Sequence, residues 1–449
     1  MPLPNPREPD ASRFAVPARA SLWRSERLLR RALVGALFVA SVAPIGCGAR
    51  NSTSSTAPHT DAGVDTVNAS VEIPATADLA VATTLGGPIH GLNASEQARF
   101  DAGLTEFQDE DGIAEGLGPV FNENSCSTCH SGPIGGTNGR LETRFGRLAE
   151  GRFDPMTELG GSLLQDHAIG AVTSPAGSFN FVAEVVPATA TVTAKRLTTP
   201  LFGLGLVDAV PDAELLVLAG LEARFAPTTA GTPSRVMEIR TGAMRVGRFG
   251  WKAQVPTLHQ FSGDAYMNEM GVTNPEFPNE NAPQGNAAAL AFNPKPTLND
   301  DGTNVAQFFD FMTLLGTPPR GPRTRSTEIG AVVFRQVGCA NCHAPTLVTG
   351  ASPVAALSYK TFHPYSDFLL HDMGGLGDGI VQGSATARQM RTAPLWGMHS
   401  RATFLHDGRA TTPEAAILAH DGQGGGARDR FLRLTGATRS ALLAFLGSL

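Results

Sequence analysis

The sequence predicts a mainly α-helical protein of two similarly built domains, of which the N-terminal one is enlarged by loops and short β-hairpins. Three observations lead to this prediction. The pattern Cys-x-x-Cys-His occurs twice, 210 positions apart from Cys129 to Cys339. A segment with the apolar spacing of a helix leads into each copy. Gly and Pro supply 50 and 32 of the 449 residues, more than their average share, which indicates long loops.

The repeated pattern is typical of covalent haem attachment. Two thiols separated by two residues can form thioethers with the two vinyl groups of one haem, and the His that follows is then held beneath the iron as a ligand. The residues are Cys126, Cys129 and His130 in the first copy and Cys339, Cys342 and His343 in the second. Zinc is the alternative, but the two pairs are too far apart for a zinc ribbon and each carries an adjacent His. We therefore expect two covalently bound haem c groups.

Residues 1–46 have the pattern of an export signal. Four Arg residues precede an apolar run, Ala32 to Ile45, that is too short to span a bilayer comfortably. Cys47 follows between two Gly residues, as in bacterial lipoproteins, although Pro44 stands where such sites prefer Leu, so a plain signal peptide is the alternative. We expect Cys47 to be lipidated and residues 47–83 to form a flexible tether. The protein would then be periplasmic or anchored to the outer membrane. Export agrees with the two haem motifs, because covalent haem attachment in bacteria takes place outside the cytoplasm.

The charge of the chain argues against a nucleic-acid partner. The formal net charge is −6, and removal of residues 1–46 takes away seven Arg and three acidic residues, which leaves 28 basic and 38 acidic groups. A basic redox protein or a small electron donor is the expected partner. Contact with a membrane is expected only through the lipid anchor.

The stretch 316–322 (GTPPRGP) is the predicted linker between the domains. Residues 84–315 would form the N-terminal haem c domain, in which a helix begins at Asn93 with Glu96 as its capping-box partner. Alternating apolar residues at 179–186 and 236–240 predict short strands or hairpins inserted in this half.

Residues 323–449 would form the C-terminal domain. Ser326 is predicted to cap the helix that leads into the second motif, and Thr412-Pro413 is a clear helix start. A last helix is expected from about Ala437 to Leu446. The order of helix, haem motif, loops and terminal helix is that of a cytochrome c domain, so we expect two cytochrome c-type domains with one covalent haem each.

Six blocks of the sequence resemble the bacterial di-haem oxidoreductase family. They are GLGPVFNENSCSTCHSGPIGG, LFGLGLVDAVPDAEL, GRFGWKAQVPTLHQ, FHPYSDFLLHDMGG, RTAPLWG and RATFLHDGRATTPEAAILAH. The resemblance covers about residues 84–449. Members of this family are described as peroxidases or thiol oxidoreductases, and they are similar to di-haem cytochrome c peroxidases. The resemblance implies that peroxide reacts at the haem of His130 and that the haem of His343 transfers electrons, although fold is more uniform than function here.

The resemblance also implies the sixth ligand of the second haem. The peroxidases place a Met fourteen residues after the His of a His-Asp-Gly segment, which His406 matches here. His420 stands at that position, so His343 and His420 are the expected ligands of the second iron, which would lower its potential relative to a His–Met pair. A solvated helix residue is the alternative for His420. The weaker candidates for this ligand are Met373, Met390, Met398 and His371.

Trp251, Gln260 and Glu269 match the Trp, Gln and Glu that serve those peroxidases. Trp251 would lie between the haems as an electron relay, and Gln260 and Glu269 would lie over the open face of the first iron, where they polarise bound oxygen and move protons. The alternatives are a buried core aromatic for Trp251 and, for Glu269, a loop carboxylate paired with Arg248. The sixth position of the first haem is expected to be open or closed by His167.

Together these features predict an exported, peroxidase-like di-haem c oxidoreductase that activates peroxide or dioxygen at the N-terminal haem. The C-terminal haem would take part in electron transfer. The alternative is a non-catalytic periplasmic electron-transfer cytochrome with both irons closed, and a third possibility is oxidation of side chains in a partner protein.

Overall fold

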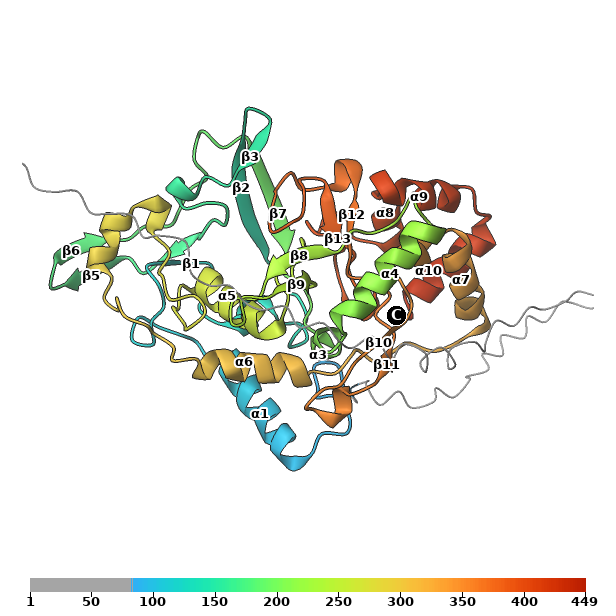
Figure 1. Cartoon of the computed structure of the whole chain (residues 1–449), viewed down its shortest axis with the longest axis horizontal. Helices are drawn as coiled ribbons and strands as arrows, with labels where there is room; N and C mark the ends of the chain where they lie inside the picture. Colours follow the sequence, from blue (N-terminus) through green and yellow to red (C-terminus); the bar gives the residue numbers. More distant parts are fainter. Residues whose placement is uncertain (1–81, 83) are drawn as a thin grey trace, which may run out of the picture. The chain divides into compact units, whose positions relative to one another are not determined.

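The structure is a computed structural model that describes residue 82 and residues 84–449 (Figure 1). The predicted signal segment, Cys47 and nearly all of the predicted tether lie outside the described residues. Of the described residues, 35% are helical and 16% lie in strands. The expectation of a mainly α-helical protein is therefore not confirmed, because short strands accompany the helices in both halves.

The described residues form ten α-helices and thirteen short strands. The helices are α1 (Ala94–Gln108), α2 (Cys126–Cys129), α3 (Leu204–Asp208), α4 (Asp212–Phe225), α5 (Leu258–Met270), α6 (Thr303–Leu314), α7 (Arg325–Gln336), α8 (Pro413–Leu418), α9 (Gly425–Leu432) and α10 (Gly436–Leu446). The strands are β1 (Val120–Phe121), β2 (Leu141–Ala149), β3 (Arg152–Asp154), β4 (His167–Ala168), β5 (Ala171–Ser174), β6 (Gly177–Asn180), β7 (Val192–Leu197), β8 (Ser234–Met237), β9 (Met244–Gly247), β10 (Leu347–Val348), β11 (Thr361–Phe362), β12 (Leu370–Asp372) and β13 (Gln389–Arg391). The sheet β3-β2-β7 has three strands, and the other strands pair two by two.

Helices α1 and α6 pack side by side in the N-terminal half (Figure 1). The start of α1 is as predicted. Asn93 Oδ1 accepts hydrogen bonds at 2.9 Å from the backbone N–H groups of Ser95 and Glu96, and Glu96 Oε2 accepts one at 2.9 Å from the N–H of Asn93. This reciprocal capping box satisfies N–H groups that have no partner inside the helix. The two helices meet through aromatic rings, with the centroids of Phe107 and Phe311 4.6 Å apart.

The helices of the C-terminal half also follow local signals. Helix α7 begins after Thr324, not after the predicted Ser326. The reason is a second reciprocal cap, in which Thr324 Oγ1 accepts from the N–H of Thr327 at 3.3 Å and Thr327 Oγ1 accepts from the N–H of Thr324 at 2.9 Å. Helix α8 begins after Thr412 as predicted, and α10 agrees with the predicted last helix to within one residue. Helices α7 and α10 pack against each other.

Two hairpins lie at or next to the predicted regions, and the described residues form four further sheets that the sequence did not indicate, of which β3-β2-β7 is the largest. Strands β6 and β8 overlap the predicted regions 179–186 and 236–240 by two residues each, and their hairpin partners β5 and β9 lie outside those regions. In the largest sheet, β2 pairs antiparallel with β7, so that Leu141 lies opposite Leu197 and Glu142 opposite Arg196. This register brings charged side chains of β2 and β7 to one wall of a cavity described below.

The apolar core consists mainly of two clusters. The larger one gathers residues of the N-terminal half together with Leu347, Phe368 and Trp396 from beyond the predicted linker. The second cluster contains residues from Val333 onward, among them Phe445 on α10. The core therefore does not divide at residues 316–322, and the two-domain division stays a prediction.

A buried ionic cluster joins the N-terminal half to the C-terminal half. Asp378 accepts a hydrogen bond at 2.8 Å from Arg196 Nε and forms an ion pair at 2.8 Å with Lys252 Nζ. Arg196, Lys252 and Asp378 have side chains that are at most 2% exposed. Buried charges of this kind depend on their partners, because each alone would be costly to remove from water.

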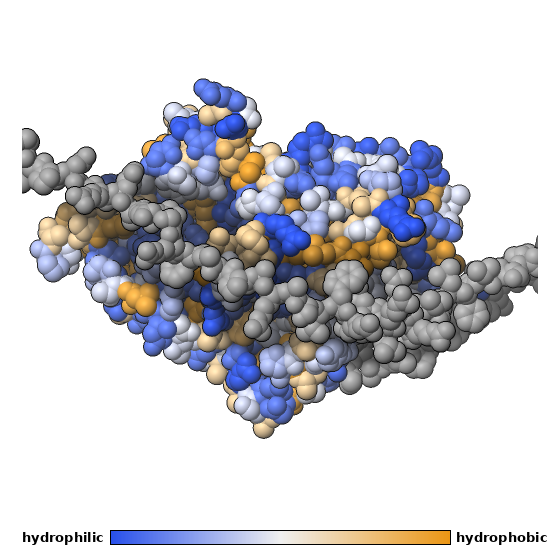
Figure 2. Space-filling model, in the orientation of Figure 1, coloured by the Kyte–Doolittle hydropathy of each residue, from blue (hydrophilic) through white to orange (hydrophobic). Residues whose placement is uncertain are grey.

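Apolar side chains gather on the outer face of α4. Val217, Leu221 and Phe225 are 58%, 49% and 73% exposed and recur every four residues, so they form one stripe along the helix. On the face drawn in Figure 2, apolar surface crosses the region where Figure 1 places α4. Among the described residues, no helix has the length and apolar character needed to cross a membrane.

Two candidate haem sites

Each Cys-x-x-Cys-His motif lies in the wall of a large cavity. The cavity of the first motif encloses about 1220 Å³ and that of the second about 1490 Å³, including the space at their mouths. The walls are mainly apolar, which suits a macrocycle with a hydrophobic ring and polar edges.

The first motif forms the single turn of α2. The N–H of His130 donates to the carbonyl oxygen of Cys126 at 3.0 Å, and this turn presents Cys126, Cys129 and His130 to the same cavity. Phe107 of α1 packs on the ring of His130 with centroids 5.9 Å apart. Burial lowers the pKa of His130 to about 4, so its imidazole is neutral at pH 7. Neutral imidazole is the form that binds iron.

The second motif repeats this geometry and adds a second imidazole. The N–H of His343 donates to the carbonyl oxygen of Cys339 at 2.9 Å. His343 Nδ1 lies 3.0 Å from the carbonyl oxygen of Tyr365, and His420 Nδ1 lies 2.8 Å from that of Ala416. Each contact fixes a proton on Nδ1 and leaves Nε2 as the free ligand atom, as is usual for histidines that bind metals.

The spacing of His343 and His420 fits one iron between them. Their ring centroids are 6.4 Å apart, and both line the second cavity. With metal–nitrogen bonds of about 2 Å and each nitrogen about 1 Å from its ring centre, imidazoles on opposite sides of one metal have centroids roughly 6 Å apart. The residues present therefore fit a haem with two axial histidines. His420 is half-buried in the wall of the second cavity. It is therefore not the solvated helix residue that was the alternative.

The weaker ligand candidates also line this cavity, but His371 is otherwise engaged. His371 Nε2 lies 2.9 Å from Asp367 Oδ2, and its Nδ1 lies 3.4 Å from Cys342 Sγ. Burial by itself lowers the pKa of His371, but the carboxylate of Asp367 outweighs it and raises this pKa to about 11. Because Asp367 and Cys342 contact its two ring nitrogens, His371 presents no free ligand atom to iron in this arrangement.

Trp251 lies between the two cavities and lines both of them, together with Leu197 and Thr198. Its Nε1 donates to the carbonyl oxygen of Leu197 at 2.7 Å, and its ring meets that of His406 edge-on with centroids 6.2 Å apart. The structure thus places Trp251 where an electron relay was expected. The relay itself stays a prediction.

Glu269 lies in the last turn of α5 and faces the first cavity. Its Oε2 accepts a hydrogen bond at 2.7 Å from Asn122 Nδ2. Burial, with the negative charge of Glu142, raises the pKa of Glu269 to about 8, while Arg144 and Asn122 act in the opposite direction. The alternative, a loop carboxylate paired with Arg248, is not observed, because Glu269 lies on a helix and Arg248 forms its ion pair with Asp212.

Sequence reasoning missed the charged neighbours of Glu269. Glu142 and Arg144 on β2 form an ion pair at 2.9 Å, and both line the first cavity. Asp264, on the same helix as Glu269, lines it too, and burial raises the pKa of Asp264 to about 6. Alternate positions on a strand share a face, so Glu142 and Arg144 could have been grouped from the sequence. The sequence could not show how close these two residues lie to Glu269.

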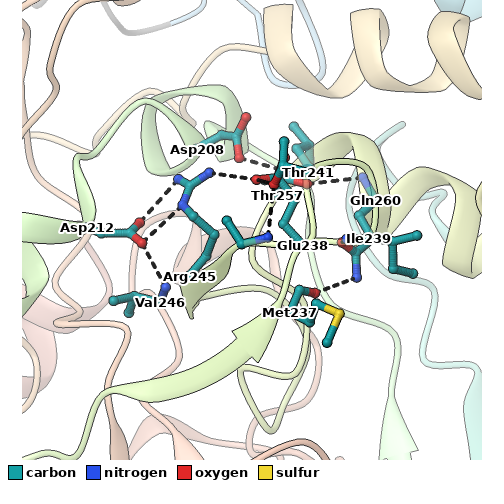
Figure 3. A network of polar contacts seen from close by, with 12 residues as sticks. Asp208, Asp212, Met237, Glu238, Ile239, Thr241, Arg245, Val246, Thr257 and Gln260 are labelled. Carbon is teal, nitrogen blue, oxygen red and sulfur yellow. Dashed lines mark hydrogen bonds and ion pairs between the residues drawn. The ribbon is translucent and has the colours of Figure 1, made fainter. Parts of the chain in front are cut away.

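Gln260 does not take the place that the resemblance implied. Its side chain is buried beside the β8-β9 hairpin, where Oε1 accepts from the N–H of Ile239 at 2.9 Å and Nε2 donates to the carbonyl oxygen of Met237 at 3.4 Å (Figure 3). Among the described residues, those that line the first cavity do not include Gln260. Gln260 therefore holds the hairpin, and the expectation that it lies over the haem is wrong for this structure.

His167 is also turned away from the first cavity. Its side chain is 51% exposed and pairs through Nδ1 with Asp166 at 2.7 Å. Pairing of β4 with β1 places His167 opposite Phe121, on whose ring it stacks. Within the described part of the chain, His130 is the one histidine that lines the first cavity. His167 is thus not placed as a ligand there.

Comparisons with known proteins give a family and several distant structural likenesses. The model of the family described as "Di-haem oxidoreductase, putative peroxidase" matches residues 178–449, more than half of the chain. No curated protein matches the sequence.

Three solved structures are similar in part to this chain. Hydrazine synthase of Kuenenia stuttgartiensis is 12% identical, covers 88% of this chain and 100% of its own, and has a TM-score of 0.33. A MauG-like protein associated with microbial copper homeostasis is 15% identical, with coverage of 82% and 94% and a TM-score of 0.37. The diheme peroxidase BthA from Burkholderia thailandensis E264 is 14% identical, with coverage of 82% and 92% and a TM-score of 0.35. The match of the family model shows that this chain belongs to the di-haem oxidoreductase family.

Proposed function

We propose that the chain is an exported di-haem c oxidoreductase of the peroxidase type, located in the periplasm or anchored to the outer membrane. Peroxide or dioxygen would react in the first cavity, and the second site would exchange electrons with a redox partner protein or a small donor. The observation that carries this proposal is the difference between the two cavities. The second offers two facing histidines, whereas the first offers His130 and, on its wall, the buried carboxyl group of Glu269.

Haem bound at the first motif would supply an iron that binds the oxygen substrate and exchanges electrons with it. Side chains of the protein would move the protons. Cleavage of an O–O bond requires a proton to leave one oxygen and reach the other, and Glu269, which lines the cavity, would carry this proton. Asn122 holds one carboxylate oxygen through its amide, which fixes the direction of the other.

The charges around Glu269 set its affinity for protons. The Glu142–Arg144 pair lies in the same wall, and Glu142 raises the pKa of Glu269 while Arg144 lowers it. The net pKa of about 8 is close to the pH of the cell exterior. A group with such a pKa can both accept and release a proton during one turnover.

Trp251 would carry electrons from the second site to the first. It is shared by both cavity walls, and its indole N–H is fixed on a backbone carbonyl, so the ring has a defined position. The second site, with His343 and His420, would have a low potential, because a second imidazole stabilises ferric iron more than a thioether does. A donor of low potential would therefore be needed.

The alternative function is a non-catalytic electron-transfer cytochrome. It requires a second protein ligand at the first iron, and two methionines, Met270 and Met312, line that cavity. A thioether that reached the iron would close the site to peroxide.

The spin states of the purified ferric protein decide between the two functions. Mass spectrometry should first show two haems attached through thioethers. Low-temperature electron paramagnetic resonance should then show one high-spin haem that binds cyanide and one low-spin haem that does not. Two low-spin haems, neither of which binds cyanide or reacts with peroxide, would support the carrier.

A further inference from the structure

We propose that Tyr266 and Asp111 form a redox-active pair beside the first cavity, in which Tyr266 gives up one electron and Asp111 accepts the phenolic proton. The inference rests on the proposed function, because peroxide supplies the oxidising power. It adds a second electron donor to the first site, separate from the path through Trp251.

The position of Tyr266 brings its ring to the cavity. It lies on α5 one turn before Glu269, lines the first cavity, and is 2% exposed. Its ring meets that of Phe308 edge-on with centroids 5.0 Å apart. The phenol is thus held in one place in the wall of the cavity that would hold the first haem, to which it would give its electron.

The hydroxyl group of Tyr266 has a built-in proton acceptor. Tyr266 Oη donates a hydrogen bond to Asp111 Oδ2 at 2.8 Å, and Asn304 Nδ2 donates one to Tyr266 Oη at 3.2 Å. The Asn304 bond occupies the oxygen lone pair, so the hydroxyl hydrogen points at the carboxylate. A phenol that loses an electron becomes a strong acid, and its proton can then cross this single hydrogen bond.

Asp111 is suited to receive that proton. It is 7% exposed, and no Lys or Arg of the described residues forms an ion pair with it. Burial, together with nearby acidic groups such as Asp109 and Glu115, raises the pKa of Asp111, although the hydrogen bond from Tyr266 opposes this. Burial likewise raises the pKa of Tyr266 above its usual range, so the phenol keeps its proton until the electron leaves.

Asp111 lies beside exposed acidic residues and near the first haem motif. Asp111 sits in a turn whose neighbours Asp109, Glu110 and Glu115 are exposed. Asp111 is also close to the first haem motif, since its N–H donates to the carbonyl oxygen of Asn124 at 2.8 Å, two residues before Cys126. The pair therefore connects the edge of the first site with an acidic patch of the surface.

The electrons and protons balance for one peroxide. Reduction of one peroxide molecule to two waters consumes two electrons and two protons. Tyr266 supplies one electron and becomes a neutral phenoxyl radical, while its proton goes to Asp111. The other electron comes from the second haem, and solvent supplies the two protons. An external reductant restores Tyr266, which then regains its proton from Asp111.

The test is freeze-quench electron paramagnetic resonance of the di-haem protein after addition of peroxide. Ring-deuterated tyrosine should narrow the radical signal, which distinguishes tyrosine from Trp251. The chain has three Tyr residues, so the assignment is simple. Tyr266→Phe should reduce the tyrosyl signal to background, whereas Tyr359→Phe, at a site that is 75% exposed, should leave it intact. Asp111→Asn should slow radical formation by about 10²-fold, because the proton loses its acceptor.

Two outcomes separate this inference from the proposed function. A wild-type protein that consumes peroxide but forms no tyrosyl radical, or one whose radical persists in Tyr266→Phe, overturns the pair alone. A protein that ignores peroxide, yet forms the Tyr266 radical when a photogenerated ruthenium(III) complex oxidises it, overturns the proposed function and keeps the pair. If Tyr266→Phe loads too little haem, the rate measured for Asp111→Asn decides, and an unchanged rate contradicts the inference.

Discussion

Replacement of Glu269 by Gln tests the proton transfer most directly. The substitution keeps the size of the side chain and removes its ability to take a proton. Because burial and Glu142 raise the pKa of Glu269 to about 8, only about one-tenth of it is ionised at pH 7. The ionised form is the base, so the rate of the wild-type reaction with peroxide should rise with pH and level off above pH 8.

The expected loss follows from the usual contribution of a positioned acid–base group. At pH 9, Glu269→Gln should react with peroxide about 10²–10⁴-fold more slowly than wild type, which is about 3–5 kcal/mol of barrier. At pH 6, where about one-hundredth of wild-type Glu269 is ionised, the ratio of the two rates should be about 100-fold smaller than at pH 9. Stopped-flow measurements of the haem spectrum with peroxide give both rates.

Substitution of the charged neighbours of Glu269 should shift the pH profile in opposite directions. Glu142→Gln removes a negative charge and leaves Arg144 unpaired, so the midpoint of the pH profile should move to lower pH. Arg144→Met should move it to higher pH. Glu280→Gln is the matched control, because burial also raises the pKa of Glu280, to about 7, yet Glu280 lines neither cavity.

The refuting results are specific. A Glu269→Gln protein that matches wild type at pH 9 would remove Glu269 from the mechanism. A loss of the same size at pH 6 and pH 9 would show that the substitution disturbs the cavity and not the proton transfer. Normal haem content and cyanide binding in the variant are needed for either conclusion.

Three further predictions concern other parts of the molecule. His420→Met should raise the potential of the second haem in spectroelectrochemistry while Met373→Leu leaves it unchanged; if His420→Ala alters neither the low-spin signal nor the potentials, another residue is the ligand. Asp378→Asn should cost about 3–5 kcal/mol in urea unfolding of the haem-loaded protein, because among the described residues it leaves buried Lys252 without a carboxylate and Arg196 with only Glu142, 4.0 Å away, whereas Asp372→Asn, at a half-exposed surface pair, should cost less than about 1 kcal/mol. Labelling with a radioactive fatty acid should mark wild type but not Cys47→Ser, and a wild type that is unlabelled and soluble in the periplasm would leave only a signal peptide.

Local signals in the sequence anticipated several elements of the fold. The capping box at Asn93 and the Thr412-Pro413 helix start involve atoms three residues apart or fewer, so the residues themselves determine the structure. The cap of α7 was misplaced because Thr324 and Thr327 form a reciprocal cap without the usual acidic residue. The hairpins were found but their ends were not, since strand ends depend on the partner strand.

At the candidate site, the position of a residue along the chain did not show whether its side chain faces the cavity. Glu269 and Gln260 are nine residues apart on one helix, and both matched the family. Nine residues are two and a half turns, so the two side chains point in different directions, and α5 can present only one of them to the cavity. His167 failed for a similar reason, because its strand pairing turned it to solvent.

The sequence alone was enough to predict the chemistry of groups that lie within five residues of one another. Two thiols and a His at Cys126–His130 and Cys339–His343 predict haem attachment wherever the motifs lie, because the spacing of the reactive atoms is set by one helical turn. The tertiary structure decided which distant groups share a cavity. It brought His420 to 6.4 Å from His343, Asn122 to 2.7 Å from Glu269 and Asp111 to 2.8 Å from Tyr266. These contacts join residues 77 to 155 positions apart, and they exist only because the packing of helices, strands and loops buries the groups together, where low polarity shifts their pKa values.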